Sequence, residues 1–319
     1  MTLTGALKAS PRFRPDRIVL RRLAIASIIA NIGIVVTGGA VRLTGSGLGC
    51  PTWPRCEDNS FVPTDVSSVH TQIEFGNRML TYVLGIVVLS TLVGVYRSPM
   101  TRPDLRRLAL VLFLGIPLQA VVGGVSVLTD LNPWVVMLHL IISMDLVAVA
   151  TLLFVRIGEG DGAPVPLVAL PIRRLAFGLL GLSGAVLYLG TIVTGSGPHA
   201  GDVDAHRTGL DTHLWSLIHA DVVIVLVLGT VALNVLLRRA GAPASVRQAA
   251  LVMLGVQLAQ GTIGYVQYFT DLPEVLVGIH MFGAGCLVVA TVRMVCSTRV
   301  RPLVAPVDDG IADHVAVPA

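Results

Sequence analysis

The sequence predicts an all-α integral membrane protein with eight transmembrane helices arranged as two pseudo-symmetric four-helix bundles. Charged residues make up only 13% of the 319 residues and the mean hydropathy is +0.79, so about half of the charge of a soluble domain is missing. The apolar residues form long uninterrupted runs, and the second half repeats features of the first. Because the runs are continuous, a soluble enzyme, a nucleic-acid-binding domain and a β-barrel of alternating polarity are excluded.

Each apolar run is long enough for one transmembrane helix. A helix rises 1.5 Å per residue, so about 20 residues cross about 30 Å of hydrocarbon, and a helix keeps every backbone polar group satisfied in lipid. The first run follows a basic arm but is too long for a signal peptide and lacks a cleavage site, so we interpret it as an uncleaved helix. In chain order, the predicted spans are 21–41, 71–96, 105–128, 134–155, 173–194, 214–237, 248–269 and 276–296.

Basic residues determine the predicted orientation. With both termini on the cytoplasmic side, the inner segments hold all but four of the 23 lysines and arginines. The four outer residues are Arg42, Arg55, Arg78 and Arg207. Because cytoplasmic segments concentrate lysine and arginine, we expect a multi-pass protein of the cell membrane with both termini cytoplasmic. The tail, 297–319, has prolines and acidic residues without an apolar period and is predicted to be disordered.

An internal repeat divides the chain into two halves. The repeat pairs Gln119 with Gln260, Gly123 with Gly264, Asp130 with Asp271 and His139 with His280, at a constant offset of 141 residues. Four spans separate equivalent positions, and this even number gives both halves the same direction across the membrane. The predicted domains are an N-terminal half, 1–155, a C-terminal half, 156–296, and the cytoplasmic tail, 297–319.

Three histidines inside the predicted spans are candidate cofactor ligands. His139 and His280 lie about five residues inside the outer ends of their helices, and His219 has a similar depth in the sixth span. Intramembrane histidines are rare and usually face the bundle interior. A single one could bond a backbone carbonyl, but His219 and His280 are expected to face each other across the second bundle and suit a bis-histidine haem clamp. Zinc would need further nitrogen or sulfur ligands close by.

The first half carries a different polar set. His70, Glu74 and Asn77 are spaced four and three residues apart, so they share one face of the second span. An intramembrane carboxylate is costly unless it pairs or functions. Glu74 either pairs with Arg78, four residues away, or acts on a substrate. The second interpretation places a permanent cofactor in one half and a substrate in the other.

The cysteines divide into an outer pair and a buried pair. Cys50 and Cys56 lie in the first outer loop, on the oxidising side, so we expect a disulfide that either staples the loop or takes part in redox chemistry. Cys286 and Cys296 are interpreted as small buried apolar residues. The third outer loop, 195–213, is either solvated or a lid over a cofactor. Its histidines are His199, His206 and His213.

Four motifs together resemble the haem A synthase family. They are Thr44-Gly-Ser-Gly-Leu-Gly-Cys-Pro-Thr-Trp-Pro-Arg-Cys56, Glu74-Phe-Gly-Asn-Arg78, Val193-Thr-Gly-Ser-Gly-Pro-His-Ala-Gly-Asp202 and His219-Ala-Asp221. The resemblance covers about 20–296 and implies an oxidoreductase acting on CH groups. Such an enzyme converts haem O to haem A by oxidising the C8 methyl to a formyl group through successive hydroxylations with water-derived oxygen.

The resemblance also implies a ligand set. It places haem b iron on His219 and His280, and the iron of the substrate haem O on His139 beside a catalytic Glu74. Where the family pattern has a second histidine for haem O, this sequence has Asn77. His70 lies about 10.5 Å outward on the same helix face and would bind only if the helix mouth or the haem were displaced. The competing possibility is a five-coordinate haem on His139 alone.

The implied role is the supply of haem A to a terminal oxidase. Haem O synthase and oxidase assembly factors are the expected partners, together with an unidentified electron acceptor. The alternative is a dihaem b-type membrane electron carrier that modifies neither haem. The different polar sets around Glu74 and Asn77 favour chemistry in one half, since an electron carrier would keep two complete ligand pairs. A transporter is disfavoured because the repeated polar positions lie near one face and not at mid-membrane.

Overall fold

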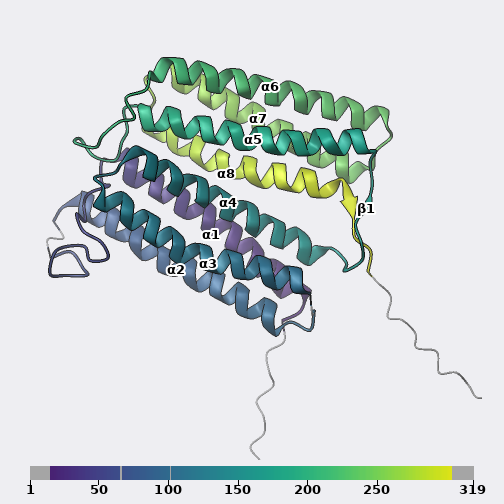
Figure 1. The fold of residues 1–319 in the computed structure, drawn as a ribbon, viewed down its shortest axis with the longest axis horizontal. Coiled ribbons are helices and arrows are strands. Elements are labelled where there is room, and N and C mark those ends of the chain that lie inside the picture. Colours follow the sequence, from purple (N-terminus) through teal and green to yellow (C-terminus); the bar gives the residue numbers. More distant parts are fainter. Residues whose placement is uncertain (1–14, 65–66, 101, 304–319) are drawn as a thin grey trace, which may run out of the picture.

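The computed structural model describes residues 15–64, 67–100 and 102–303. Within these residues the fold has eight α-helices and one two-stranded sheet (Figure 1). All eight helices are long and apolar enough to cross a membrane, which confirms the predicted all-α, multi-pass fold class. The helices are α1 (Arg17–Leu43), α2 (Val69–Arg97), α3 (Pro103–Leu128), α4 (Pro133–Gly158), α5 (Leu170–Ser196), α6 (Thr212–Arg239), α7 (Ala244–Phe269) and α8 (Glu274–Ser297). The strands are β1 (Val165–Pro166) and β2 (Arg299–Val300).

Local sequence signals explain where several helices begin. The side chains of Asp16 and Asp211 accept hydrogen bonds from first-turn N–H groups of α1 and α6. Pro103 and Pro133 are the first residues of α3 and α4, where the missing N–H has no intrahelical partner to lose. Each helix contains its predicted span and extends it by a few residues at one or both ends.

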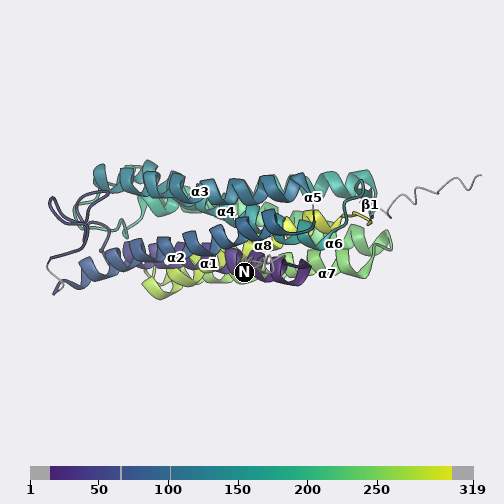
Figure 2. The ribbon, with the colours of Figure 1, turned by 90° about the horizontal axis from the view of Figure 1, so that it is seen from below.

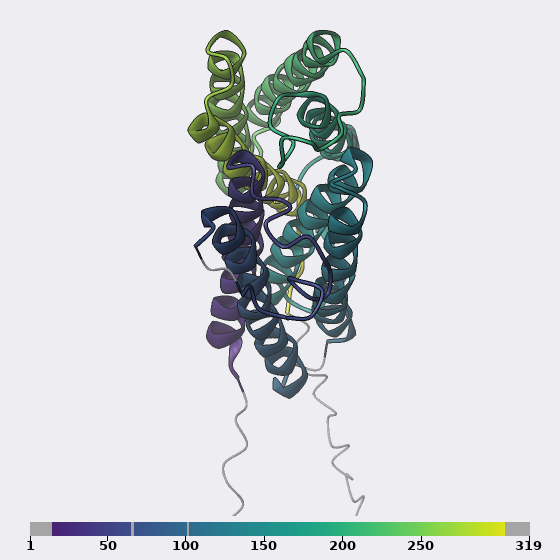
Figure 3. The same cartoon turned by 90° about the vertical axis from the view of Figure 1, so that its left-hand side faces the viewer.

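The helices pack as two four-helix bundles that lie side by side (Figures 1 and 3). Helices α1 to α4 surround one apolar core and α5 to α8 surround another. Helices α1, α4, α5 and α8 make the contacts between the bundles. Figure 2 shows that the helices run lengthwise along the molecule, and Figure 1 shows the α1–α4 bundle inclined to the α5–α8 bundle. The seam has a third apolar core, formed by Ile32, Val35, Met144, Val147 and Val288.

The outward faces of the helices carry large apolar side chains. Ile86 of α2 is 66% exposed, and Leu228 of α6 is 62% exposed. In water such a surface would drive association. In a bilayer it is the surface that contacts lipid, so the exposed apolar residues agree with the membrane assignment.

The internal repeat extends to the backbone conformation of two turns. Asp130 and Leu131, between α3 and α4, have φ of 52° and 57°. Asp271 and Leu272, between α7 and α8, both have φ of 56°. A non-glycine residue in this left-handed region costs about 1–3 kcal/mol. The same uncommon pair at an offset of 141 residues therefore indicates that the two turns share one geometry.

The segment after α8 is more ordered than the sequence predicted. Val300 of β2 pairs with Val165 of β1, and the carbonyl of Thr298 accepts a hydrogen bond from Leu167 N–H. Backbone bonds to the α4–α5 connection hold this segment, so the predicted disorder does not begin at residue 297. The remainder of the predicted tail, 304–319, lies outside the described residues.

Candidate functional site

His219 and His280 come together near one end of the C-terminal bundle. His219 projects from α6 and His280 from α8, and each lies near the start of its helix, at the same end of the bundle. A glycine lies beside each ring. A Cβ atom on Gly190 of α5 would stand 3.3 Å from Cε1 of His219, and one on Gly264 of α7 would stand 3.5 Å from Cε1 of His280. All four helices of this bundle therefore shape the space around the histidines.

The N-terminal bundle repeats this arrangement with one exchange. His139 projects from α4, and a Cβ atom on Gly123 of α3 would stand 3.1 Å from its Cε1. On α2 the corresponding side chain is Asn77, beside Gly38 of α1, with a distance of 3.9 Å from the Cβ position to Nδ2. Thr37 Oγ1 donates a hydrogen bond of 2.8 Å to Asn77 Oδ1. The bundle thus offers one imidazole and one carboxamide.

The three histidines have a buried ring nitrogen without a partner. Nδ1 of His139, His219 and His280 is covered, and none makes a hydrogen bond of good geometry, although the carbonyl of Val186 lies beside His219. An unsatisfied buried polar group costs about 1–3 kcal/mol. All three imidazoles are therefore buried without using their full hydrogen-bonding capacity within the chain.

A metal ion held by side chains alone does not fit these positions. In the part of the chain that the structure describes, no group of three or more His, Cys, Asp or Glu side chains could hold a metal ion. Zinc and non-haem iron sites need at least three such ligands. Haem iron needs only one or two axial protein ligands, because the porphyrin supplies the others. The residues present therefore fit haem.

Glu74 is buried and connects α2 to the first outer loop. Its Oε1 accepts a hydrogen bond of 2.6 Å from Arg78, and its Oε2 accepts one of 2.5 Å from the Cys50 N–H. Arg78 also donates to the carbonyls of Cys50, Thr52 and Arg55. The pairing of Glu74 with Arg78 is therefore formed, and both side chains hold the loop against the helix.

The disulfide between Cys50 and Cys56 is present, as predicted, with a Cα–Cα distance of 4.4 Å. The loop that it closes carries Trp53 into the N-terminal bundle, where a Cβ atom on Gly124 would stand 2.3 Å from the indole. Gly124 is adjacent in sequence to the glycine beside His139. The stapled loop therefore covers the end of the bundle where His139 lies (Figure 3).

His70 lies at the mouth of α2 and turns toward the first outer loop. It is exposed, and its Nδ1 is 3.0 Å from Oγ of Ser46. Asn77 lies two turns deeper, about 10.5 Å along the helix. The displacement that His70 would need in order to bind iron is therefore not present, and its ligand role stays a prediction.

The third outer loop is fastened over the C-terminal bundle. Arg42, at the end of α1, donates to the carbonyl of Thr194 at 2.5 Å and to the carbonyl of His199. His199 Nε2 in turn lies 3.1 Å from the carbonyl oxygen of Leu272, in the α7–α8 turn. These contacts favour the lid interpretation for this part of the loop.

The two outer loops also contact each other. Gly47 of the first loop donates a backbone hydrogen bond of 2.7 Å to the carbonyl of Gly201 in the third. His206 is exposed, and so is His213, which the structure places in the first turn of α6 and not in the loop. Their exposure agrees with the solvated alternative for those two residues. The two bundles therefore share a joined cover at the end that carries the intramembrane histidines.

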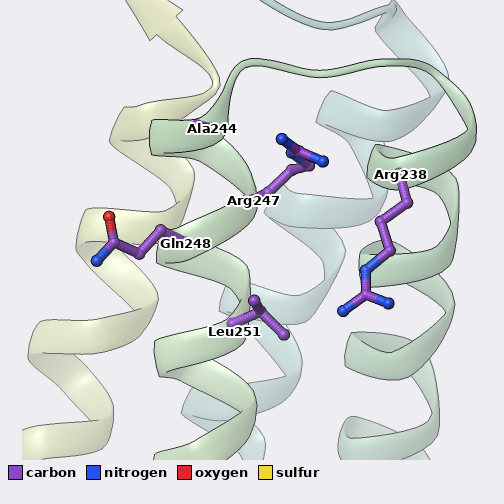
Figure 4. A pocket seen from close by; sticks show the side chains of 5 residues that line it. All are labelled: Arg238, Ala244, Arg247, Gln248 and Leu251. Atoms are coloured by element: carbon purple, nitrogen blue, oxygen red, sulfur yellow. The ribbon is translucent and has the colours of Figure 1, made fainter.

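Two surface grooves on the C-terminal bundle do not include the histidines. One of about 530 Å³ lies at the α6–α7 turn, where the guanidinium groups of Arg238 and Arg247 flank it from the two helices (Figure 4). It is at the far end of α6 from His219. A second, of about 410 Å³, lies between the same helices and has Gln257 among its lining residues. Neither is lined by His219 or His280.

The sequence alone did not reveal the residues that shape the site but are not themselves candidate ligands or catalytic residues. Gly123 and Gly264 were visible as part of the repeat, but nothing in the sequence assigned them to the histidines. Gly38 and Gly190 do not share the offset of that repeat. The roles of Arg42 and Trp53 depend on contacts between distant segments, which no local signal reveals.

The fold and site define a class of multi-pass membrane protein in which imidazoles gather at the same end of two four-helix bundles. The family model described as cytochrome oxidase assembly protein (COX15-CtaA) matches residues 21–292, and the chain belongs to this family. This match confirms the resemblance to the haem A synthase family noted in the sequence.

Three relatives show the extent of the similarity. The Heme A synthase of Geobacillus kaustophilus is 26% identical over 311 residues, which cover 93% of this chain and 96% of that relative. The Heme A synthase of Exiguobacterium sibiricum is 30% identical over 181 residues, 54% of this chain and 59% of that relative. That of Bacillus pumilus is 30% identical over 186 residues, 56% of this chain and 59% of that relative. The chain thus spans about three fifths of the last two relatives.

Proposed function

We propose that the protein is a haem A synthase, an oxidoreductase that converts the C8 methyl of haem O to a formyl group. The observation that carries this proposal is the pair of matched histidine-bearing sites in two repeated bundles, in a chain whose relatives are named Heme A synthase. One site retains its haem as a cofactor and the other holds the haem that is changed.

In this proposal the C-terminal half holds haem b, and His219 and His280 would hold its iron. When bound, haem b supplies one-electron redox chemistry. The histidines come from α6 and α8, and their rings pack against Gly190 and Gly264, where a larger side chain would crowd them. The packed helices would hold both imidazoles in place for the iron.

The N-terminal half binds the substrate haem O, with His139 as its protein ligand. Conversion of a methyl to a formyl group takes one oxygen atom from water and releases four protons and four electrons. In two successive hydroxylations, two C–H bonds are replaced by C–O bonds, and the resulting hydrate loses water. The electrons pass to an acceptor that is still unidentified.

Glu74 is the proposed catalytic carboxylate of the substrate half. It is only 5% exposed, and a buried charge acts strongly on a charge that develops nearby. Its position one turn from Asn77 supports a role in stabilising positive charge at the reacting carbon or in accepting the proton released there. The hydrogen bonds from Arg78 and Cys50 hold the carboxylate in one orientation.

The proposed setting is the cell membrane, with both termini cytoplasmic and the histidine-bearing end at the outer face. The distribution of basic residues along the chain supports this orientation. Haem O synthase would supply the substrate, and terminal oxidase assembly factors would receive haem A. The family description, cytochrome oxidase assembly protein, supports a link to a terminal oxidase.

Pigment analysis tests the proposal directly. The full-length protein is produced in a host that makes haem O, purified, and its haems are extracted and separated. We expect haem b together with haem A or its hydroxylated precursor. Two unmodified haems would support a dihaem electron carrier instead, and a colourless protein would contradict haem binding altogether.

A further inference from the structure

The substrate half differs from the cofactor half at one axial position. Asn77 on α2 corresponds to His219 on α6, because each side chain has a glycine of the preceding helix beside it. These glycines are Gly38 and Gly190. On the last helix of each bundle the histidine is kept. The two halves therefore share a scaffold but not a complete pair of imidazoles.

Asn77 is oriented by its neighbour and is a poor replacement for an imidazole. Thr37 donates to its Oδ1, so this oxygen is already engaged, and the Nδ2 group lies toward Gly38. The lone pair of a carboxamide nitrogen is delocalised into the carbonyl, so this group donates hydrogen bonds and does not bind iron well. Asn77 can orient a ligand at this position without being the ligand.

Other polar side chains on this face of α2 are engaged elsewhere. His70 bonds Ser46 at the helix mouth, and Glu74 binds Arg78 and the first outer loop.

We infer that the N-terminal half gives its haem a single protein ligand, His139, and leaves the opposite axial position to a small exogenous ligand beside the Asn77 amide. The inference rests on the proposed function, since it requires haem in both halves. The inference adds to the proposed function a difference in how the two halves bind their haems. The retained haem is closed by two imidazoles, and the haem to be converted has an open position that a small molecule can enter.

Carbon monoxide is a direct probe of an open axial position. Purified full-length protein loaded with both haems is reduced, and its absorption spectrum is recorded before and after addition of the gas. We expect the haem of the N-terminal half to bind carbon monoxide and that of the C-terminal half to remain low-spin and unchanged. In the oxidised protein, electron paramagnetic resonance is expected to show one high-spin and one low-spin signal.

Two substitutions at one position sharpen the test. Asn77→His supplies the missing imidazole, so carbon monoxide binding should fall at least tenfold while the haem content is retained. Asn77→Leu removes the amide without supplying a ligand, so carbon monoxide should still bind. His139→Ala should remove the responsive haem and leave the low-spin signal. A site with one imidazole would be supported if Asn77→His kept its haem but lost carbon monoxide binding, while Asn77→Leu kept both.

Several outcomes would overturn the inference. Two low-spin haems and no response to carbon monoxide in the unmodified protein would mean that a second protein ligand is present. If His70→Ala then created the response, His70 would be that ligand. These results would leave the proposed function intact, because both haems would be bound. A protein that binds no haem would overturn the proposed function and this inference together.

Discussion

The two bundles build similar spaces and place different side chains in them. In the C-terminal bundle, His219 and His280 lie near the same end, with a glycine beside each ring. In the N-terminal bundle, the glycines and His139 are kept, but Asn77 replaces the first histidine. The difference teaches that the two bundles share their helix packing and differ in one side chain at this position. In the proposed function, this side chain distinguishes the site of a retained cofactor from the site of a substrate.

The loops that cover the two bundles also differ in how they are held. The loop over the N-terminal bundle is closed by the Cys50–Cys56 disulfide and tied to its own helix by Glu74 and Arg78. The loop over the C-terminal bundle is fastened by Arg42, which comes from the other bundle. The N-terminal loop is therefore held mainly by its own bundle, and the C-terminal loop is held partly by the neighbouring bundle.

The largest expected effect is at the two-histidine site of the C-terminal bundle, His219 and His280. His280→Ala removes one of the two ligands that the proposed function assigns to haem b, so the low-spin haem b signal should be lost. The absorption and electron paramagnetic resonance spectra of the purified variant measure this change. His139→Ala is the matched control at the equivalent position of the other bundle, and it should leave the low-spin signal in place. An unchanged low-spin spectrum in His280→Ala would remove His280 from the ligand set.

The next effect separates chemistry from loop anchoring in the N-terminal bundle. Glu74→Gln keeps the size of the side chain and removes its charge, so haem A formation should fall about 100-fold or more while haem content is retained. Product analysis of the extracted haems measures the loss. Arg78→Gln is the control, because it breaks the same ion pair and leaves the carboxylate. An equal loss in both variants would mean that Glu74 acts only by holding the loop.

The helices and the main candidate residues were accessible from sequence for a physical reason. Lipid requires long apolar segments and makes a buried polar side chain costly. The spans and the histidines within them can therefore be recognised from the local sequence. The pair Cys50 and Cys56 was equally visible, since few residues separate the two thiols and the outer side is oxidising. Glu74 and Arg78 were recognisable as a pair because they lie one helical step apart.

The remaining parts depend on how distant segments meet. Arg42 reaches Thr194 and His199, more than 150 residues away, and no local pattern encodes that contact. The glycines beside the rings are defined by what approaches them, and many glycines in the same helices face open space. The strand β2 forms only because the α4–α5 connection presents a partner. Such contacts between distant segments can be identified only from the folded structure.

The smallest expected effect tests whether the glycines provide room for haem. In Gly190→Val the new side chain would start 3.3 Å from His219, and crowding of this kind costs about 1–3 kcal/mol. Retention of haem b should therefore weaken by about 5- to 150-fold, since 1.4 kcal/mol corresponds to a factor of ten.

Gly181→Val on the same helix is the matched control for this prediction. A Cβ atom on Gly181 meets nothing within 4 Å, so the substitution changes helix propensity without crowding the histidine. Haem loss to excess apomyoglobin, followed by absorption, measures both variants against the unmodified protein. Equal rates of loss in the two variants would mean that the space beside His219 does not govern haem binding, and the matched glycines of the two bundles would then be a feature of helix packing alone.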